Sequence, residues 1–252
     1  MGKLQDKIAL ITGSSHGIGS AIARRFANEG AKVVLHGRDK DALESLRREI
    51  SDKGGEVISL IADVTKFNEI EAMRKSIEKE LGPVEVLVVN AGGSHTKPMP
   101  FEEIPEDGWH ASVDANLTAT FLTIKSFLPG MKAQKRGNII TMSSAAARHT
   151  SGKSPVPYSA AKAGIQIMTQ HLASELGVYG IRINCIAPET IMTERNKQWI
   201  PADLQKEMAG WHPIKRLGRP EDVAQAAVFL ASEESAWITG VILDIAGGTV
   251  LV

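Results

Sequence analysis

Cysteine is almost absent from this chain of 252 residues, which contains only Cys185. A single thiol excludes an internal disulfide framework and a CxxC site, and the apolar run around Cys185 predicts a buried structural thiol. A chain of this length can bury a hydrophobic core without covalent cross-links. A reducing compartment, the cytoplasm, is therefore the expected location.

Charge of one sign and long apolar runs are also lacking. Lysine and arginine number 29, as do aspartate and glutamate, so the formal net charge of +0 predicts neither nucleic acid nor an anionic membrane as partner. No apolar run is long enough to span a membrane, and residues 8–11 are too few for a signal-peptide core. The 7 histidines do not fall in HExxH or beside paired carboxylates, so no metal site is predicted.

Short β-branched apolar runs recur along the chain, with helical stretches between them. Helical periodicity marks residues 17–30, 41–54 and 67–82, each ending in glycine, as helix C-termini often do. Apolar strands that alternate with helices predict a doubly wound α/β domain, with helices on both faces of a parallel sheet. No linker interrupts the alternation, so one domain over 1–252 is expected. The predicted strands are residues 7–12, 32–36, 56–61, 84–90, 137–143, 181–187 and 240–245.

A long insertion, residues 189–219, precedes the last expected helix. Long connections in compact domains are commonly functional, and this one is predicted to be a substrate lid. Its tryptophans, Trp199 and Trp211, either pack an amphipathic lid helix or form an aromatic wall toward the substrate.

A glycine-rich turn follows the first expected strand. Gly13, Gly17 and Gly19 lie between this strand and a helix that starts near Ile18. Glycines permit a tight turn and close approach of a ligand to the backbone, while N–H groups at a helix N-terminus attract an anion such as a pyrophosphate. The spacing is Gly-x3-Gly-x-Gly rather than GxGxxG. A dinucleotide site is favoured over a merely structural turn.

One of only 2 tyrosines, Tyr158, stands four positions before Lys162 in "YSAAK". On a helix these positions share a face, so the ammonium lies one turn from the phenol and favours the phenolate. Taken alone, however, this spacing more often marks an exposed tyrosine and a solvated lysine on a helix surface.

Together with other short motifs, the glycine turn and "YSAAK" resemble the short-chain dehydrogenase/reductase family. The resemblance extends over essentially the whole chain, and the carboxyl-terminal part also resembles 3-oxoacyl-[acyl-carrier-protein] reductases and related carbonyl reductases. It implies a Rossmann fold with a seven-stranded parallel sheet and a homotetramer. The motifs are "TGSSHGIG", "NAG" at 90–92, Asn116 in "DANL", Ser144 in "MSSA" and "YSAAK" at 158–162.

The resemblance implies a catalytic tetrad of Asn116, Ser144, Tyr158 and Lys162. Carbonyl reduction by a nicotinamide leaves negative charge on the carbonyl oxygen, which must then be protonated. Tyr158 would be the general acid in this direction and the general base in the reverse direction. Lys162 would lower the pKa of the phenol and bind the nicotinamide ribose, Ser144 would orient the substrate oxygen, and Asn116 would hold a water that relays protons. Ser143 competes with Ser144, and Asn116 could instead be an ordinary helix-surface residue.

The cofactor site follows from the same resemblance. Asn90 would stabilise the strand edge near the adenosine, and Asp63 would accept a hydrogen bond from the adenine. Glu189 departs from the family, which usually has glycine there. The expected cofactor-binding residues are Gly13, Ser15, His16, Gly17, Ile18, Gly19, Gly37, Arg38, Asp63, Val64, Asn90, Ala91, Gly92, Tyr158, Lys162, Pro188, Ile191 and Thr193.

The choice between NADP(H) and NAD(H) is predicted from the residues after the second strand. NAD-preferring members have an acidic side chain there, whereas this chain has Gly37 followed by Arg38, a planar cation suited to a 2′-phosphate. NADP(H) is favoured. NAD(H) stays possible because His16 stands where NADP-preferring relatives often carry arginine or lysine, and because Asp39 can compete for Arg38.

The sequence thus predicts an NADP(H)-dependent ketoreductase that acts on a small carbonyl or alcohol substrate. The alternatives are an NAD(H)-dependent secondary-alcohol dehydrogenase and a non-catalytic dinucleotide sensor; an enoyl reductase is disfavoured because that branch has its tyrosine and lysine farther apart. The substrate itself is not predicted, since it depends on the lid and on loops 93–106 and 145–156. His95 and His149 are candidates for the mouth of the substrate site.

Overall fold

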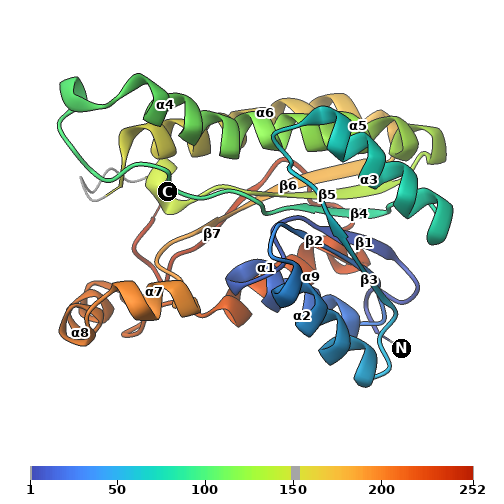
Figure 1. Cartoon of the computed structure of the whole chain (residues 1–252), viewed down its shortest axis with the longest axis horizontal. Coiled ribbons are helices and arrows are strands. Elements are labelled where there is room, and N and C mark those ends of the chain that lie inside the picture. Colours follow the sequence, from blue (N-terminus) through green and yellow to red (C-terminus); the bar gives the residue numbers. More distant parts are fainter. Residues whose placement is uncertain (1, 149–153, 252) are drawn as a thin grey trace.

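One twisted sheet forms the centre of the computed structural model, which describes residues 2–148 and 154–251 (Figure 1). The strands are β1 (Ile8–Ile11), β2 (Lys32–Gly37), β3 (Val57–Ile61), β4 (Val86–Val89), β5 (Gly137–Met142), β6 (Ile181–Pro188) and β7 (Ile242–Ile245). All pair in parallel, in the order β3-β2-β1-β4-β5-β6-β7. The seven predicted strands and the parallel sheet are confirmed.

Helices cover both faces of the sheet, as expected for a doubly wound fold (Figure 1). On one face lie α1 (Gly17–Asn28), α2 (Lys40–Asp52) and α9 (Pro220–Ala231); on the other lie α3 (Phe67–Glu80), α5 (Ala119–Gln134) and α6 (Val156–Leu176). α4 (Glu106–Val113) continues into α5 through a π-helical segment, Asp114–Thr118. Short 3-10 turns span Phe101–Glu103, Ala145–Ala147, Gly177–Tyr179 and Glu233–Ser235.

The apolar character of the strands follows from this double covering. In β1, Ala9 and Ile11 enter the core on the α1 side, while Ile8 and Leu10 enter the core on the opposite side. Successive side chains of a strand point to opposite faces, so a strand buried on both sides is expected to be apolar at most positions. Burial of each large aliphatic side chain contributes roughly 1.5–3 kcal/mol. The few polar side chains that are buried within the strands, such as Thr141 and Asn184, have hydrogen-bond partners inside the fold.

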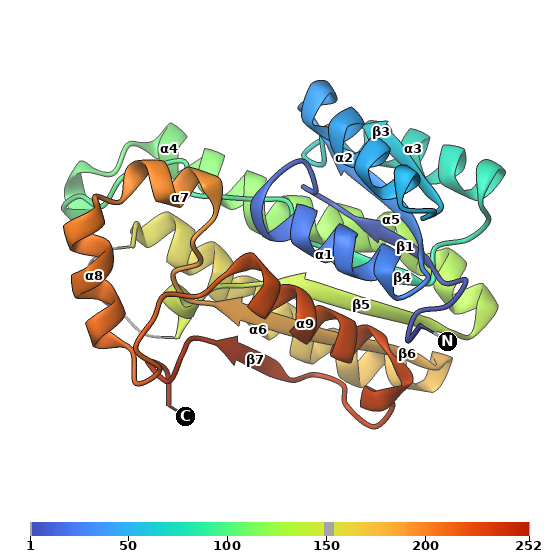
Figure 2. The ribbon, with the colours of Figure 1, turned by 90° about the horizontal axis from the view of Figure 1, so that it is seen from below.

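The expected lid follows β6 and contains two short helices, α7 (Glu194–Trp199) and α8 (Ala202–Trp211). Both lie at the same end of the molecule as α4, beyond the carboxyl ends of the strands (Figure 2). Among the described residues, no helix is both long enough and apolar enough to cross a bilayer.

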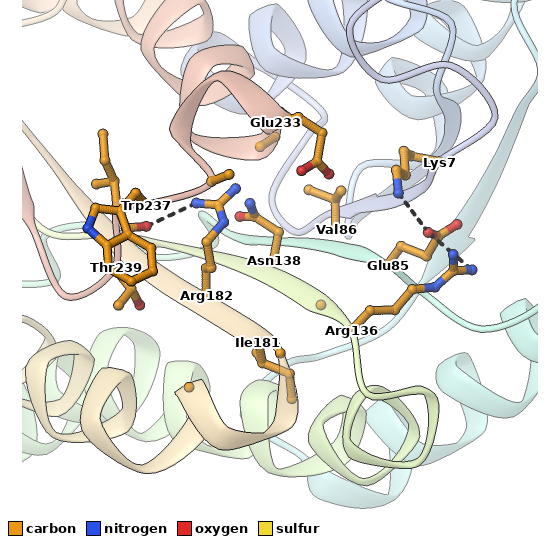
Figure 3. Close-up of a pocket in the computed structure, with 16 residues that line it drawn as sticks. Lys7, Glu85, Val86, Arg136, Asn138, Ile181, Arg182, Glu233, Trp237 and Thr239 are labelled. Atoms are coloured by element: carbon orange, nitrogen blue, oxygen red, sulfur yellow. Dashed lines mark hydrogen bonds and ion pairs between the residues drawn. The ribbon is translucent and has the colours of Figure 1, made fainter.

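The amino-terminal edge of the sheet has a cavity of about 450 Å³, shown in Figure 3. Four of its charged side chains, Lys7, Glu85, Arg136 and Arg182, bind each other or the backbone. Glu85 pairs with Lys7 at 3.2 Å and with Arg136 at 3.3 Å. Arg182 donates three hydrogen bonds of 3.0 Å to backbone carbonyls, those of Leu230, Ser232 and Ile238. These contacts join β6 to the segment that connects α9 with β7, which indicates a structural role.

Replacing Arg182 tests that role. Arg182→Met removes three charge-assisted hydrogen bonds, so we expect the free energy of unfolding in urea to fall by about 1–3 kcal/mol. Lys7→Met is the control, because its ion pair with Glu85 is partly exposed and should contribute at most about 1 kcal/mol. Equal stabilities of the two variants would contradict this assignment.

Candidate active site

A second cavity, of about 850 Å³, opens at the carboxyl ends of the strands. Every residue of the expected cofactor set lines it, together with Ser144. The cleft lies where β1 and β4 are neighbours and the chain leaves them toward opposite edges of the sheet. In open α/β sheets this position is the usual place for a ligand. The structure thus brings residues from distant parts of the sequence to one site.

The glycine turn forms one wall of the cleft. Gly13 and Gly17 have φ angles of 66° and 57°, a left-handed conformation that favours glycine. A Cβ on Gly19 would come within 2.2 Å of the Gly13 carbonyl oxygen. His16 precedes α1 without a side-chain hydrogen bond to the helix terminus, so no capping side chain takes up the first N–H groups of α1. This donor set fits the pyrophosphate of a dinucleotide.

Asn90 connects this turn to the end of β4 by hydrogen bonds. Its side-chain amide donates hydrogen bonds of 3.0 Å to the carbonyls of Thr12 and Gly13. The Thr12 hydroxyl accepts in return from the backbone N–H groups of Asn90 and Ala91, both at 3.0 Å. The two loops that border the cleft between β1 and β4 are thereby held in one fixed arrangement.

The end of β2 supplies a cation to the cleft. Asp39 caps α2 by accepting from the Ala42 N–H at 3.1 Å and pairs with His16 at 3.0 Å. These hydrogen bonds, first that from Ala42 and then that from His16, lower the pKa of Asp39. Within the described part of the chain, Arg38 makes no hydrogen bond or ion pair. The expected competition of Asp39 for Arg38 is therefore absent, because Asp39 binds His16 instead.

Asp63 follows β3 on the same side of the cleft. One carboxylate oxygen accepts from the backbone N–H of Thr65 at 3.0 Å and from its hydroxyl at 2.7 Å. These hydrogen bonds lower the pKa of Asp63, so the side chain is an ionised acceptor at neutral pH. This chemistry suits an adenine amino group.

Tyr158, Lys162 and Ser144 meet where α6 passes the end of β5. Ser144 forms a hydrogen bond with the Tyr158 hydroxyl. The Lys162 ammonium lies 5.6 Å from the centre of the tyrosine ring and donates to the Met142 carbonyl at 2.8 Å. Lys162 is buried, with an exposed fraction of 4%. The interpretation of the pair as an exposed tyrosine and a solvated lysine is therefore wrong.

Burial controls the ionisation of both groups in the protein without cofactor. It raises the pKa of Tyr158, against the opposing effect of the hydrogen bond from Ser144. It also lowers the pKa of Lys162 to about 8. The expected lowering of the phenol pKa by Lys162 is thus not what this structure shows, because burial disfavours the phenolate and the opposing contribution comes from Ser144. The phenol is protonated at neutral pH, as an acid for carbonyl reduction must be.

The two neighbouring serines differ in their contacts. The Ser143 hydroxyl is buried, donates to the Lys162 carbonyl at 2.8 Å and accepts from the Gln166 amide at 3.0 Å. The Ser144 hydroxyl is the one beside Tyr158. Ser143 therefore supports α6, whereas Ser144 is placed to contact a substrate oxygen.

Asn116 lies in the π-helical segment and is completely buried. Its Oδ1 accepts from the Gly93 N–H at 3.1 Å, and its Nδ2 donates to the carbonyls of Gly93 and Ser112, both at 2.8 Å. It is not among the residues that line the cleft, although its neighbour Ala115 is. The helix-surface interpretation is wrong, and the contacts shown fix the loop after β4.

Glu189 makes an unexpected contact. Its carboxylate accepts from His212 at 2.7 Å, and the other ring nitrogen of His212 bonds the Met208 carbonyl at 2.8 Å. His212 follows α8 and is only 3% exposed. Glu189 thus joins the end of the expected lid to the end of β6. Sequence reasoning singled out Glu189 as unusual but not His212, since no local pattern connects residues so far apart.

The remaining residues proposed for substrate contact differ in position. His95 lines the cleft, whereas His149 lies outside the described residues. Neither Trp199 nor Trp211 is among the residues that line the cleft. Trp199 is 69% exposed and contacts the guanidinium of Arg195 at 5.2 Å. The lid segment contributes polar residues to the cleft instead, including Glu194, Arg195, Asn196 and Gln198.

The contact between Glu189 and His212 can be tested by introducing glycine at position 189, the residue usual there in short-chain dehydrogenase/reductases. Glu189→Gly leaves a buried imidazole without its partner, so we expect the free energy of unfolding to fall by about 1–3 kcal/mol. Glu189→Gln keeps an acceptor and should lose less. Urea denaturation of the three proteins measures the difference, and a glycine variant as stable as the wild type would refute the contact.

Comparisons with known proteins agree with this architecture. A family model described as "Enoyl-(Acyl carrier protein) reductase" matches residues 13–250. Glucose 1-dehydrogenase 2 of Bacillus subtilis (strain 168) is 40% identical over 253 residues, which cover 98% of this chain and 96% of that protein.

Solved structures of similar proteins also match this chain over nearly its whole length. A 3-oxoacyl-[acyl-carrier protein] reductase from Brucella melitensis with bound NAD has a TM-score of 0.91 and 34% identity, covering 99% of this chain and 93% of that one. A gluconate 5-dehydrogenase from Burkholderia cenocepacia J2315 in complex with NADP and tartrate has a TM-score of 0.91 and 30% identity, covering 98% and 96%.

Proposed function

The chain belongs to the short-chain dehydrogenase/reductase family, and we propose that it is an NADP(H)-dependent ketoreductase. As a member of this family it is an oxidoreductase that acts on carbonyl or alcohol groups and binds a nicotinamide dinucleotide. The observation that carries the proposed reaction is the hydrogen-bonded pair of Ser144 and Tyr158 beside the buried Lys162, all in the cleft that holds the glycine turn.

The proposed mechanism assigns one role to each side chain. A bound nicotinamide supplies the hydride. Ser144 orients the substrate oxygen, and Tyr158 donates its hydroxyl proton to that oxygen as negative charge develops there. The buried ammonium of Lys162 stabilises the phenolate that remains. Because Lys162 also lines the cleft, it is placed to donate hydrogen bonds to the ribose hydroxyls of the cofactor. Asn116 positions the loop after β4, through its contacts with Gly93.

The preference for NADP(H) rests on Arg38. Arg38 lines the cleft, and Asp39, the nearest acidic residue in the sequence, pairs with His16. A 2′-phosphate beside Arg38 gains a charge-assisted hydrogen bond, whereas a 2′-hydroxyl gains a weaker one. The solved relatives include one with NAD and one with NADP, so an NAD(H)-dependent alcohol dehydrogenase is the second candidate.

We further propose a cytoplasmic homotetramer and a single domain over residues 1–252, in which residues 189–219 cover the substrate. Carbonyl substrates related to 3-oxoacyl thioesters are favoured by the resemblance of the carboxyl-terminal part of the chain. The names of the two other relatives, a glucose dehydrogenase and a gluconate dehydrogenase, make polyhydroxylated substrates the first alternatives for a substrate panel.

Loss of the proposed acid is the first test of this function. Tyr158→Phe removes one hydroxyl and little volume, so NADPH should still bind while turnover falls by about 10²–10⁴. Turnover is followed by nicotinamide absorbance with a panel of ketones. The other tyrosine offers a matched control: Tyr179→Phe alters a side chain that contacts Lys132, away from the cleft, and should leave turnover unchanged. More than about a tenth of wild-type turnover in Tyr158→Phe would exclude the tyrosine as the acid.

Cofactor preference is tested at Arg38. Arg38→Ala removes a charged hydrogen bond to a 2′-phosphate, so kcat/KM for NADPH should fall by about 1–3 kcal/mol in transition-state terms while that for NADH changes little. Steady-state kinetics with both cofactors measure this. If the wild type uses NADH with the higher efficiency, or the variant loses both activities equally, the NADP(H) proposal is wrong.

A further inference from the structure

His36 is a buried histidine that none of the assignments above uses. It lies on β2 with an exposed fraction of 2%. Its Nδ1 lies 3.3 Å from the backbone nitrogen of Gly13, and its Nε2 lies 3.0 Å from the carbonyl oxygen of Ala62. Gly13 belongs to the glycine turn and Ala62 to the loop after β3, and both line the cleft. The imidazole therefore connects two walls of the cleft directly.

These two partners determine the protonation of the ring. A backbone N–H can only donate and a carbonyl can only accept, so Nδ1 must carry the lone pair and Nε2 the proton. Only the neutral Nε2–H tautomer makes both bonds. A second proton would place an N–H group at Nδ1 against the N–H of Gly13. The bond that holds the glycine turn would then be replaced by repulsion.

We propose that His36 is a positioning residue of the cofactor site, which holds the glycine turn at a fixed distance from the loop after β3. This inference rests on the proposed binding of a nicotinamide dinucleotide. The glycine turn fits the pyrophosphate, and Asp63, next to Ala62, suits the adenine. A ligand that touches both walls needs them at the correct separation, and His36 sets this separation through Gly13 and Ala62.

The backbone of His36 keeps its own contacts, which separates positioning from folding. Its N–H donates to the Ser14 hydroxyl at 2.9 Å, and its carbonyl accepts from the Ser14 N–H at 2.8 Å. A substitution of the side chain leaves these hydrogen bonds in place. Variants of His36 should therefore retain the sheet and lose only the bridge across the cleft, that is, the two hydrogen bonds of the His36 ring with Gly13 and Ala62.

The bridge should weaken on the acid side. Burial lowers the pKa of His36, while the Ala62 carbonyl and Asp63 act to raise it and Arg38 acts to lower it. Because burial holds the folded pKa of His36 below the unfolded value of about 6.5, the neutral ring and its two bonds are present at that pH and above, and they are lost as the pH falls through the lowered, folded pKa. Asp63 keeps its charge in this range, since its pKa is lowered.

Three substitutions test the bridge. His36→Leu removes both bonds, His36→Asn offers an oxygen that can accept from Gly13, and His36→Gln offers an N–H that can reach Ala62. Binding of NADPH to each protein is measured by fluorescence titration. We expect the dissociation constant of His36→Leu to rise roughly tenfold, with smaller increases for the two amides. As the pH is lowered, NADPH affinity should fall less in His36→Leu than in the wild type, because the variant has no imidazole to protonate. Protonation of the cofactor phosphate affects both proteins equally and so cancels in this comparison.

Val34→Ala is the matched control, because Val34 is a buried residue of the same strand that packs in the apolar core. It should lower the melting temperature without changing NADPH affinity. If Val34→Ala loses as much NADPH affinity as His36→Leu, the effect of His36 is one of general stability, and the proposed positioning role is wrong. Wild-type affinity in His36→Leu would overturn the proposal as well.

Hydrogen exchange in the absence of cofactor gives a second, independent readout. The Gly13 amide should exchange faster in His36→Leu than in the wild type, while the amide of Ser14, which bonds the His36 carbonyl, stays protected. Unchanged exchange at Gly13 would contradict the bridge itself. A wild-type protein that binds neither NADPH nor NADH, with faster Gly13 exchange in the variant, would instead refute the proposed function and leave the bridge intact.

Discussion

Burial of the sheet on both faces is the constraint on which the rest of this structure depends. Strands that are covered on two sides are mainly apolar, and a polar side chain on them, such as His36, needs hydrogen-bond partners inside the fold. Polar side chains that can reach a ligand therefore gather mainly where the strands end, and in a parallel sheet all carboxyl ends lie at one edge. Residues as distant in sequence as Gly13, Asp63, Asn90, Ser144 and Pro188 meet there for this reason. The opposite edge, with Arg182 and Glu85, holds the connections together instead.

The same burial governs the electrostatics of the cleft. Removal of water favours neutral forms, so the pKa of Tyr158 rises and that of Lys162 falls to about 8. A protonated phenol beside a lysine that is still mostly an ammonium at neutral pH is suited to giving up a proton when charge develops on a nearby oxygen. In the proposed reaction, the low polarity that opposes the phenolate in the resting protein also strengthens the attraction of Lys162 once the phenolate forms.

Polar side chains inside the fold act mainly on backbone groups. Asn90, Asn116 and His36 each bond backbone N–H or carbonyl groups of loops that border the cleft. Buried polar groups need partners, and loop backbones have unsatisfied ones, so these side chains hold the loops in single conformations. Glu189 and His212 do the same for the segment after β6, where a carboxylate replaces the glycine that is usual in the family.

The sequence by itself determined the fold class, the seven strands and the set of expected cofactor residues, which all line one cleft. Strand burial and the glycine turn are local patterns, and the motif order of the family extends over the whole chain. Tertiary structure decided what depends on partners distant in sequence: that Ser143 faces α6, that Asp39 binds His16 rather than Arg38, and that burial raises the pKa of Tyr158. Hydrogen bonding and desolvation depend on which groups surround a side chain in space, and no local spacing encodes those neighbours.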